Sequence, residues 1–178
     1  MGTLPSFTTF SAGSILTAAQ LNTNVRDAGN FFLSWPVFEG RQTVAQSIPN
    51  GTPTGVTYDT NDVDTDTGHS TVTNTTRYTG KTGGRFQLSG GIGFAANATG
   101  RRAAQWYRNG SAVNAGSAMM PATAANDCAL AARTITVFLN GTTDYIELFA
   151  YQESGGALNT FVTGGGQPSL SVRMVGST

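Results

Sequence analysis

Charged side chains are scarce in this sequence. Only 11% of its 178 residues are Asp, Glu, Lys or Arg, whereas about 25% is usual for a soluble protein. The ten basic and ten acidic side chains cancel to a formal net charge of zero. Proteins that bind nucleic acid or an anionic membrane surface normally carry a basic patch or a net positive charge. We therefore expect no nucleic-acid partner and no membrane partner.

Cysteine and histidine occur once each. Cys128 is the only cysteine, so an intrachain disulfide is excluded, and its apolar neighbours favour a small buried side chain over a reactive thiol. His69 is the only histidine, which excludes a His-rich metal site and leaves one possible centre for a Ser-His-Asp triad. No Gly-x-Ser-x-Gly elbow supplies a nucleophile. We expect His69 to make hydrogen bonds in a loop or in the core, and we expect no enzymatic activity.

Long apolar runs are also missing. No stretch of about 18 apolar residues could form a membrane-spanning helix. The first residues, Met1 to Pro5, lack the basic flank and apolar core of a secretory signal. The sequence gives no sign of export by that route, and a single cysteine suits a protein that folds in the cytoplasm.

A short helix is predicted near the start of the chain. Thr17 is followed three residues later by Gln20, which is the pattern of a capping box. Beyond it, apolar residues are spaced by four, three and four positions, so they form one stripe. These residues are Leu21, Val25, Ala28 and Phe32. Pro36 ends the pattern.

A lone helix of about 15 residues is marginal in water. It therefore has to dock, either on its own domain or on copies of itself as a trimeric neck or an anchor to a larger assembly. We divide the chain into an N-terminal anchoring segment, residues 1–36, and a second domain, residues 37–178.

After Pro36 the sequence changes to short runs rich in β-branched and aromatic residues, separated by turn residues. This pattern predicts an all-β sandwich or barrel, with enough strands for a jelly roll. Asn-Gly pairs at 50–51, 109–110 and 140–141 are typical of hairpin turns. The expected strands are Phe38–Gln46, Thr54–Tyr58, Thr71–Tyr78, Gly84–Ala95, Arg101–Arg108, Leu130–Leu139, Asp144–Tyr151 and Ser169–Val175.

Two segments could hold a ligand. Asp62, Asp64 and Asp66 alternate along an acidic stretch, and hard cations prefer such carboxylates. A twelve-residue calcium loop starting at Asp62 would need Glu at position 73, which is Thr, so the alternatives are a looser calcium site and a solvated acidic loop. We expect no other cofactor. Trp106, Tyr107 and Arg108 form either a docking patch for a partner or sugar, or a strand that is half core and half surface.

The order of the strand motifs resembles the globular heads of the tumour necrosis factor and complement-head superfamily. The resemblance covers residues 38–176 and implies a jelly roll that assembles as a homotrimer. By analogy with such trimers, Tyr145, Leu148, Phe149 and Tyr151 are expected near the three-fold axis. The matching segments are Phe38-Glu39-Gly40-Arg41, Val56-Thr57-Tyr58-Asp59, residues 80–90, residues 106–110, residues 139–148 and residues 169–175.

The segment from Thr9 to Asp27 has a distinctive sequence, Thr-Phe-Ser-Ala-Gly-Ser-Ile-Leu-Thr-Ala-Ala-Gln-Leu-Asn-Thr-Asn-Val-Arg-Asp. It resembles the leader of small structural proteins from tailed bacteriophages of actinobacteria. This resemblance implies a non-enzymatic virion surface protein, a capsid decoration or a head or tail fibre, assembled in the cytoplasm of the bacterial host. Its partners would be its own copies and other virion proteins, such as the major capsid or tail proteins. The alternative is a minor tail protein tip that binds a receptor or a host cell-surface glycan. A glycan-cleaving tail protein is disfavoured, because the carboxylates crowd one segment instead of facing each other across a cleft.

Overall fold

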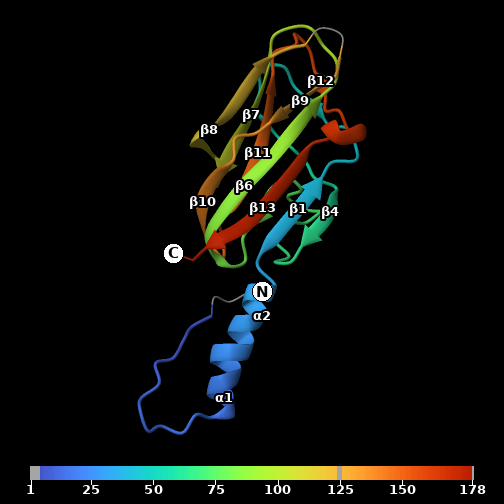
Figure 1. Cartoon of the computed structure of the whole chain (residues 1–178). Helices are drawn as coiled ribbons and strands as arrows, with labels where there is room; N and C mark the ends of the chain where they lie inside the picture. Colours follow the sequence, from blue (N-terminus) through green and yellow to red (C-terminus); the bar gives the residue numbers. More distant parts are fainter. Residues whose placement is uncertain (1–4, 124–125, 178) are drawn as a thin grey trace.

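The computed structural model describes residues 5–123 and 126–177. Within them, two antiparallel sheets pack face to face, and a helix projects from one end of this sandwich (Figure 1). The first sheet has the order β10-β6-β13-β1-β4, with β9 also paired to β6. Its strands are β1 (Val37–Arg41), β4 (Thr60–Asp64), β6 (Gly83–Phe94), β9 (Cys128–Ala131), β10 (Ile135–Asn140) and β13 (Ser169–Gly176).

The second sheet has the order β3-β11-β7-β8, with β5 also paired to β11. Its strands are β3 (Thr54–Gly55), β5 (Arg77–Thr79), β7 (Arg101–Arg108), β8 (Ser111–Pro121) and β11 (Tyr145–Gln152). A small separate ribbon pairs β2 (Ser47–Ile48) with β12 (Leu158–Asn159), and a 3-10 turn, η2, spans Gly164–Gly166. No described helix is long and apolar enough to cross a membrane.

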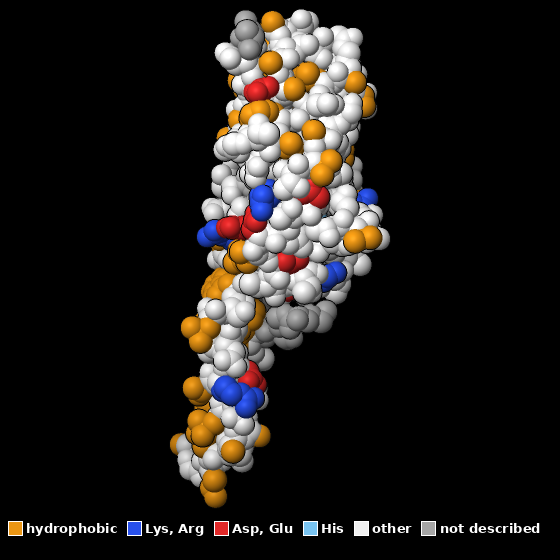
Figure 2. Space-filling view, turned by 90° about the vertical axis from the view of Figure 1, so that its right-hand side faces the viewer, with side chains coloured by type: hydrophobic (Ala, Val, Ile, Leu, Met, Phe, Trp, Pro, Cys, Tyr) orange, Lys and Arg blue, Asp and Glu red, His pale blue; other side chains and the backbone are white. Residues whose placement is uncertain are grey.

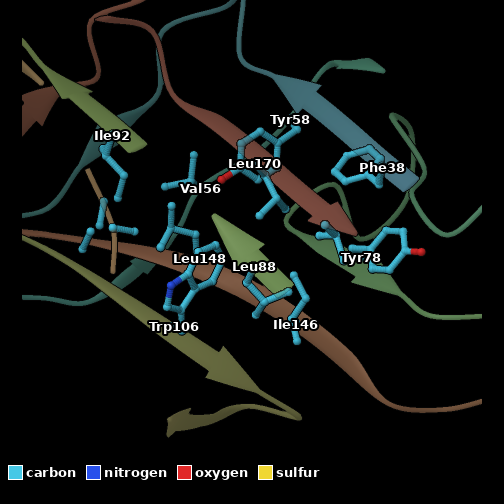
Figure 3. Packing of buried hydrophobic residues seen from close by; sticks show 14 of the residues in the cluster. Phe38, Val56, Tyr58, Tyr78, Leu88, Ile92, Trp106, Ile146, Leu148 and Leu170 are labelled. Atoms are coloured by element: carbon cyan, nitrogen blue, oxygen red, sulfur yellow. The ribbon is translucent and has the colours of Figure 1, made fainter. Parts of the chain in front are cut away.

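The core lies between the two sheets. Because successive side chains of a strand point to opposite faces, β6 alternates exposed Arg85 and Gln87 with buried Phe86 and Leu88. Leu88 and the other buried side chains of the first sheet meet Trp106 and Leu148 from the second (Figure 3). This alternation, visible in the sequence, is what divides each strand into a core side and an outward side.

Half of the eight predicted strands are confirmed. Arg101–Arg108 is β7 with the same bounds, the expected strands at 84–95 and 144–151 are shifted by one residue at both ends from β6 and β11, and 169–175 is one residue shorter than β13. The other four are wrong in detail. The runs 38–46 and 54–58 are strand only over β1 and β3. The run 130–139 is split into β9 and β10, and the run 71–78 is strand only at β5. The long strand β8 was not predicted, because its residues are mostly small and turn-like.

The chain turns at all three Asn-Gly pairs with a positive φ at the glycine, but only Asn109-Gly110 is a hairpin, because the strands flanking the other two pairs do not pair with each other. Asn109 and Gly110 have φ of 52° and 77° between β7 and β8, as a tight hairpin requires. Gly51 and Gly141 have φ of 69° and 77°. A Cβ on Gly141 would also lie 2.4 Å from the Gly83 nitrogen, so both conformation and space require glycine at that turn.

The N-terminal helix begins as predicted. Thr17 and Gln20 form the reciprocal capping box, and α1 (Ala18–Leu21) continues through a π-helical turn, η1 (Asn22–Asp27), into α2 (Ala28–Leu33). Residues 18–33 are thus one helix of about 24 Å. It projects from the head, and the segment before it runs back alongside it (Figure 1).

The four residues of the predicted apolar stripe differ in exposure within one chain, and their docking on other copies stays a prediction. Leu21, Val25 and Phe32 are exposed, at 45%, 64% and 54%, but Ala28 is buried. Asn24 on the same helix is also buried. Its side-chain oxygen accepts a hydrogen bond from the Thr8 backbone nitrogen at 2.6 Å. The π-helical turn widens the helical repeat, so four residues spaced for an ordinary heptad do not stay on one open face.

Candidate functional site: an aromatic hollow and an apolar stalk

The outward face of the second sheet carries a hollow. Its volume is about 230 Å³, and its lining comes mainly from β7, β8 and β11. We call this site the aromatic hollow. It is lined by Pro53, Arg101, Ala103, Gln105, Tyr107, Ala112, Ser117, Met119, Phe149 and Tyr151.

The hollow follows from side-chain sizes across the sheet. β7 contributes every second residue to this face, and its small Ala103 is paired across the strands with Tyr151 on one side and Met119 on the other. The next outward position, Gln105, is paired with Phe149 and with small Ser117. Small residues therefore form the floor, and larger residues form the walls.

The most ordered wall is a pair of stacked rings. Tyr107 and Phe149 have ring centroids 3.9 Å apart and planes inclined by 23°. Both are partly exposed, and they stand on adjacent strands. Neighbouring rings hold each other in fixed orientations, so this wall presents a rigid aromatic surface to the solvent.

The rim of the hollow has a fixed polar group. Arg101 pairs with Glu153 through Nε at 2.9 Å and Nη2 at 3.0 Å, and the Tyr151 hydroxyl donates a hydrogen bond to Glu153 Oε1 at 2.6 Å. This Tyr151 bond, together with Arg101, lowers the pKa of Glu153, and the bond to Glu153 raises the pKa of Arg101. Both charges are therefore present at neutral pH, side by side and with a sum of zero.

The predicted trimer-interface set is separated by the fold. Leu148 is fully buried in the core of a single chain, so its assignment to an interface is wrong. Tyr145, Phe149 and Tyr151 point to the outward face of β11, where Tyr145 lies under the Arg77 guanidinium at 4.1 Å. Nothing in a single chain tests whether these three meet another copy.

The predicted docking patch is also divided. Trp106 is fully buried, and its ring nitrogen donates a hydrogen bond to the Arg133 carbonyl at 2.6 Å, so its place in a surface patch is wrong. Arg108 forms an ion pair with Asp144 at 2.7 Å. Of the predicted three residues, only Tyr107 lines the hollow. The alternative expectation, a strand that is half core and half surface, is therefore the one that the structure confirms, because neighbours on a strand face opposite sides.

The three carboxylates proposed for calcium do not form a site. Asp62 pairs with Arg41 at 2.9 Å, and Asp64 accepts hydrogen bonds from the Gly68 and His69 backbone nitrogens. Asp66 is buried and accepts from the Lys81 backbone nitrogen at 2.8 Å. In the described part of the chain, no three His, Cys, Asp or Glu side chains are grouped to hold a metal ion. Of the two alternatives for this stretch, the looser calcium site is therefore not the one found, because these carboxylates have other partners. The solvated acidic loop is only partly right, because residues 60–64 form strand β4.

The predictions for the only cysteine and the only histidine are confirmed. Cys128 is a free, buried cysteine. His69 is buried, with Nδ1 2.8 Å from Asn61 Oδ1 and Nε2 3.1 Å from the Thr75 carbonyl. Its ring stacks on Phe38 with centroids 4.9 Å apart. These contacts give the imidazole a structural role in the core.

A second feature lies where the helix meets the head. Apolar side chains follow the length of the helix of residues 18–33, which we call the stalk, and most charged groups on the same face lie in the lower half of the head and on the helix (Figure 2). A hollow of about 400 Å³ opens at the junction. It is lined by Pro5, Phe7, Phe31, Phe32, Trp35, Met174, Gly176 and Ser177.

Some residues of the aromatic hollow were missed at the level of sequence. Arg101 and Met119, which line the hollow, and Glu153, which pairs with Arg101 beside it, were not singled out as a group, although outward positions of β7 and β11 could be read from their alternation. Met119 could not be found in this way, since β8 itself was not predicted.

The fold has known counterparts. Murine APRIL at pH 5.0 superposes with a TM-score of 0.59 and 10% sequence identity over 79% of this chain and 99% of its own. The Eiger TNF from S. frugiperda gives a TM-score of 0.58 and 10% identity over 82% and 95% of the two chains. The predicted jelly roll of the tumour necrosis factor type is thus confirmed as the fold. No protein-family model and no curated protein sequence matches this chain.

Proposed function

We propose that this chain is a non-enzymatic structural protein that forms a homotrimer on the surface of a bacteriophage particle. Residues 1–36 attach it to the particle, and the jelly-roll head covers or extends the surface as a capsid decoration or as part of a head or tail fibre. The fold suits a structural or binding protein, and it is the kind of head that the sequence resemblance associates with trimers.

The contrast between a complete head and an uncovered stalk carries this proposal. Leu21 and Val25 are 45% and 64% exposed, and Leu33 is 88% exposed, although the head has already buried its own core. Uncovered apolar residues on a short helix oppose its stability in water. Other copies of the helix, or a neighbouring virion protein, would cover them.

The leader supports the phage assignment. Its sequence from Thr9 to Asp27 resembles leaders of small structural proteins of tailed bacteriophages, and in this structure it comprises the first part of the stalk, α1 and η1, and the segment before it. A free, buried Cys128 agrees with assembly in the bacterial host cytoplasm. The partners on the particle would be the major capsid or tail proteins.

A receptor- or glycan-binding minor tail protein tip is a second candidate function. The aromatic hollow favours it, because the site is concave, partly apolar and edged by fixed polar groups. The two functions are compatible in one protein, since the hollow lies on the head and the attachment lies in the stalk.

The first test is the mass of the purified protein in solution, measured by light scattering. A homotrimer gives about three times the mass of one chain. A single-chain mass at micromolar concentration contradicts the trimer. Circular dichroism on the same sample checks that the head is folded.

The second test separates attachment from folding. We expect the truncation to residues 37–178 to leave a folded head that no longer binds the particle. Leu21→Asp combined with Val25→Asp should have the same effect, because charges cannot be buried at an apolar contact. Thr23→Asp, at an exposed position of the same helix, is the matched control. Recovery of the truncated protein on virions at normal copy number overturns the anchoring role.

A further inference from the structure

We propose that the aromatic hollow binds one or two rings of a neutral saccharide. This inference rests on the second candidate function, a glycan-binding head, and does not depend on the attachment of residues 1–36 to a particle. Three properties of the hollow support it: its size, its aromatic wall and its charge-balanced rim.

The size of the hollow suits a small ring. Its volume of about 230 Å³ is below the roughly 300–1,000 Å³ of sites that hold drug-sized ligands. The floor is flat because Ala103, Ala112 and Ser117 are small. A pyranose ring is a compact disc, and it can lie on such a floor without displacing a side chain.

The aromatic wall suits the carbon-bound hydrogens of a sugar. The faces of Tyr107 and Phe149 carry the negative part of the ring quadrupole, and because the rings stack on each other, a ligand would use the faces that this contact leaves free. The C–H groups on one face of a pyranose carry small positive charges, and they are attracted to such a surface. Since the two rings already fix each other, little conformational freedom is lost when a ligand binds.

The rim suits neutral hydroxyl groups. A sugar hydroxyl is both a donor and an acceptor. Arg101 lines the hollow and offers its remaining guanidinium N–H donors. Glu153 does not line the hollow but is paired with Arg101 at its edge, and its oxygens, which already accept from Arg101 and Tyr151, can accept a further hydrogen bond. Because their charges cancel, the rim has no net preference for an anion or a cation. The charge balance therefore favours a neutral saccharide over a phosphorylated or acidic one.

A second copy of this chain fits the hollow less well. A stable contact between copies buries roughly 1,200–2,000 Å² and needs a complementary protrusion. The hollow instead is a local depression in a sheet whose central strands, β7 and β11, are flanked by β8 and β3. This alternative remains an outcome of the test.

The test uses the full-length protein and a panel of neutral monosaccharides and disaccharides: glucose, galactose, mannose, arabinose, N-acetylglucosamine, maltose and lactose. Saturation-transfer NMR identifies binders, and titration gives the apparent Kd. For the best binder we expect Tyr107→Ala and Glu153→Gln each to weaken binding by roughly tenfold. Ser117→Leu, which fills the floor and removes neither ring nor charge, should abolish it.

The matched control is Tyr145→Ala. Tyr145 lies on the same outward face of β11 but does not line the hollow, so its removal should leave the Kd within twofold. Circular dichroism and light scattering are measured on every variant. The proposal is overturned if no sugar binds the wild-type protein, or if the hollow variants bind as well as Tyr145→Ala. It is also overturned if these variants lower the assembled mass while sugar binding is absent, because the hollow is then a contact between copies.

Discussion

The head and the stalk of this molecule differ in how far each is complete within one chain. In the head, Leu88, Trp106 and Leu148 are fully buried between two sheets. In the stalk, Leu21 and Val25 remain largely exposed on a helix that touches the head only near its end. The head should therefore fold by itself, whereas the stalk gains its stability from assembly. Changes in the head should alter the free energy of unfolding equally with and without residues 1–36.

The largest effect is expected at Arg102. Its guanidinium is fully buried and donates hydrogen bonds to the carbonyls of Asn97, Thr99 and Arg101. Among the described residues no carboxylate pairs with it. Arg102→Ala removes the guanidinium donors of the Asn97 and Thr99 carbonyls, whereas the Arg101 carbonyl keeps a hydrogen bond from the Glu153 backbone nitrogen. We expect a loss of about 3 kcal/mol.

Urea unfolding of the full chain and of residues 37–178 measures this loss. Arg101→Ala, on the exposed side of the same strand, is the control and should cost less than about 1 kcal/mol. If the loss from Arg102→Ala differs between the two chains by more than the experimental error, residues 1–36 contribute to the stability of the head. The head is then not an independently folding unit.

Local pattern was sufficient to predict much of this fold. Alternation in Arg85–Ser89 and Tyr145–Phe149 located β6 and β11, Asn109-Gly110 located a hairpin, and Thr17 with Gln20 located the start of the helix. Strand β8 was not predicted because its small residues show no apolar alternation. It forms a strand because it pairs with β7, and this tertiary contact is not visible in the local sequence.

The site was harder to predict than the fold. Trp106, Tyr107 and Arg108 are consecutive, but only Tyr107 lines the hollow, since strand neighbours face opposite sides. The hollow needs Phe149 beside Tyr107, and that contact joins strands about 40 residues apart. The partners of the acidic stretch could not be predicted from the sequence for a similar reason. The fold brings backbone nitrogens and Arg41 to its carboxylates, which form hydrogen bonds and an ion pair with them.

An intermediate effect is expected from pH. Burial lowers the pKa of His69, although the Thr75 carbonyl and the charge of Asp64 oppose that shift. The unfolded chain therefore takes up a proton near pH 6.5 that the folded chain resists. Stability is full above about pH 6.5 and falls as the pH drops toward the lowered value, by up to about 1.4 kcal/mol per pH unit.

His69→Gln should remove this part of the acid sensitivity. Thermal unfolding of both proteins between pH 7.5 and 5 measures it, in the full chain and in residues 37–178. The difference in stability between wild type and variant should shrink as the pH falls. A difference that is constant with pH contradicts a lowered pKa for His69.

The smallest effect is expected to be a gain. The Tyr58 hydroxyl is buried and has no hydrogen-bond partner among the described residues, and burial raises the pKa of Tyr58. Tyr58→Phe removes a desolvated polar atom and keeps the ring, so we expect stability to rise by about 1 kcal/mol.

Tyr78→Phe is the matched control, because the Tyr78 hydroxyl donates a hydrogen bond to Asp66 at 3.4 Å. Its loss should destabilise the head. Urea unfolding should thus give opposite signs for two tyrosines in one core, and neither change should alter the assembled mass, because both lie inside the head. Equal losses at the two positions would show that the Tyr58 hydroxyl is satisfied in solution, and a change in mass would show that assembly reaches into the head.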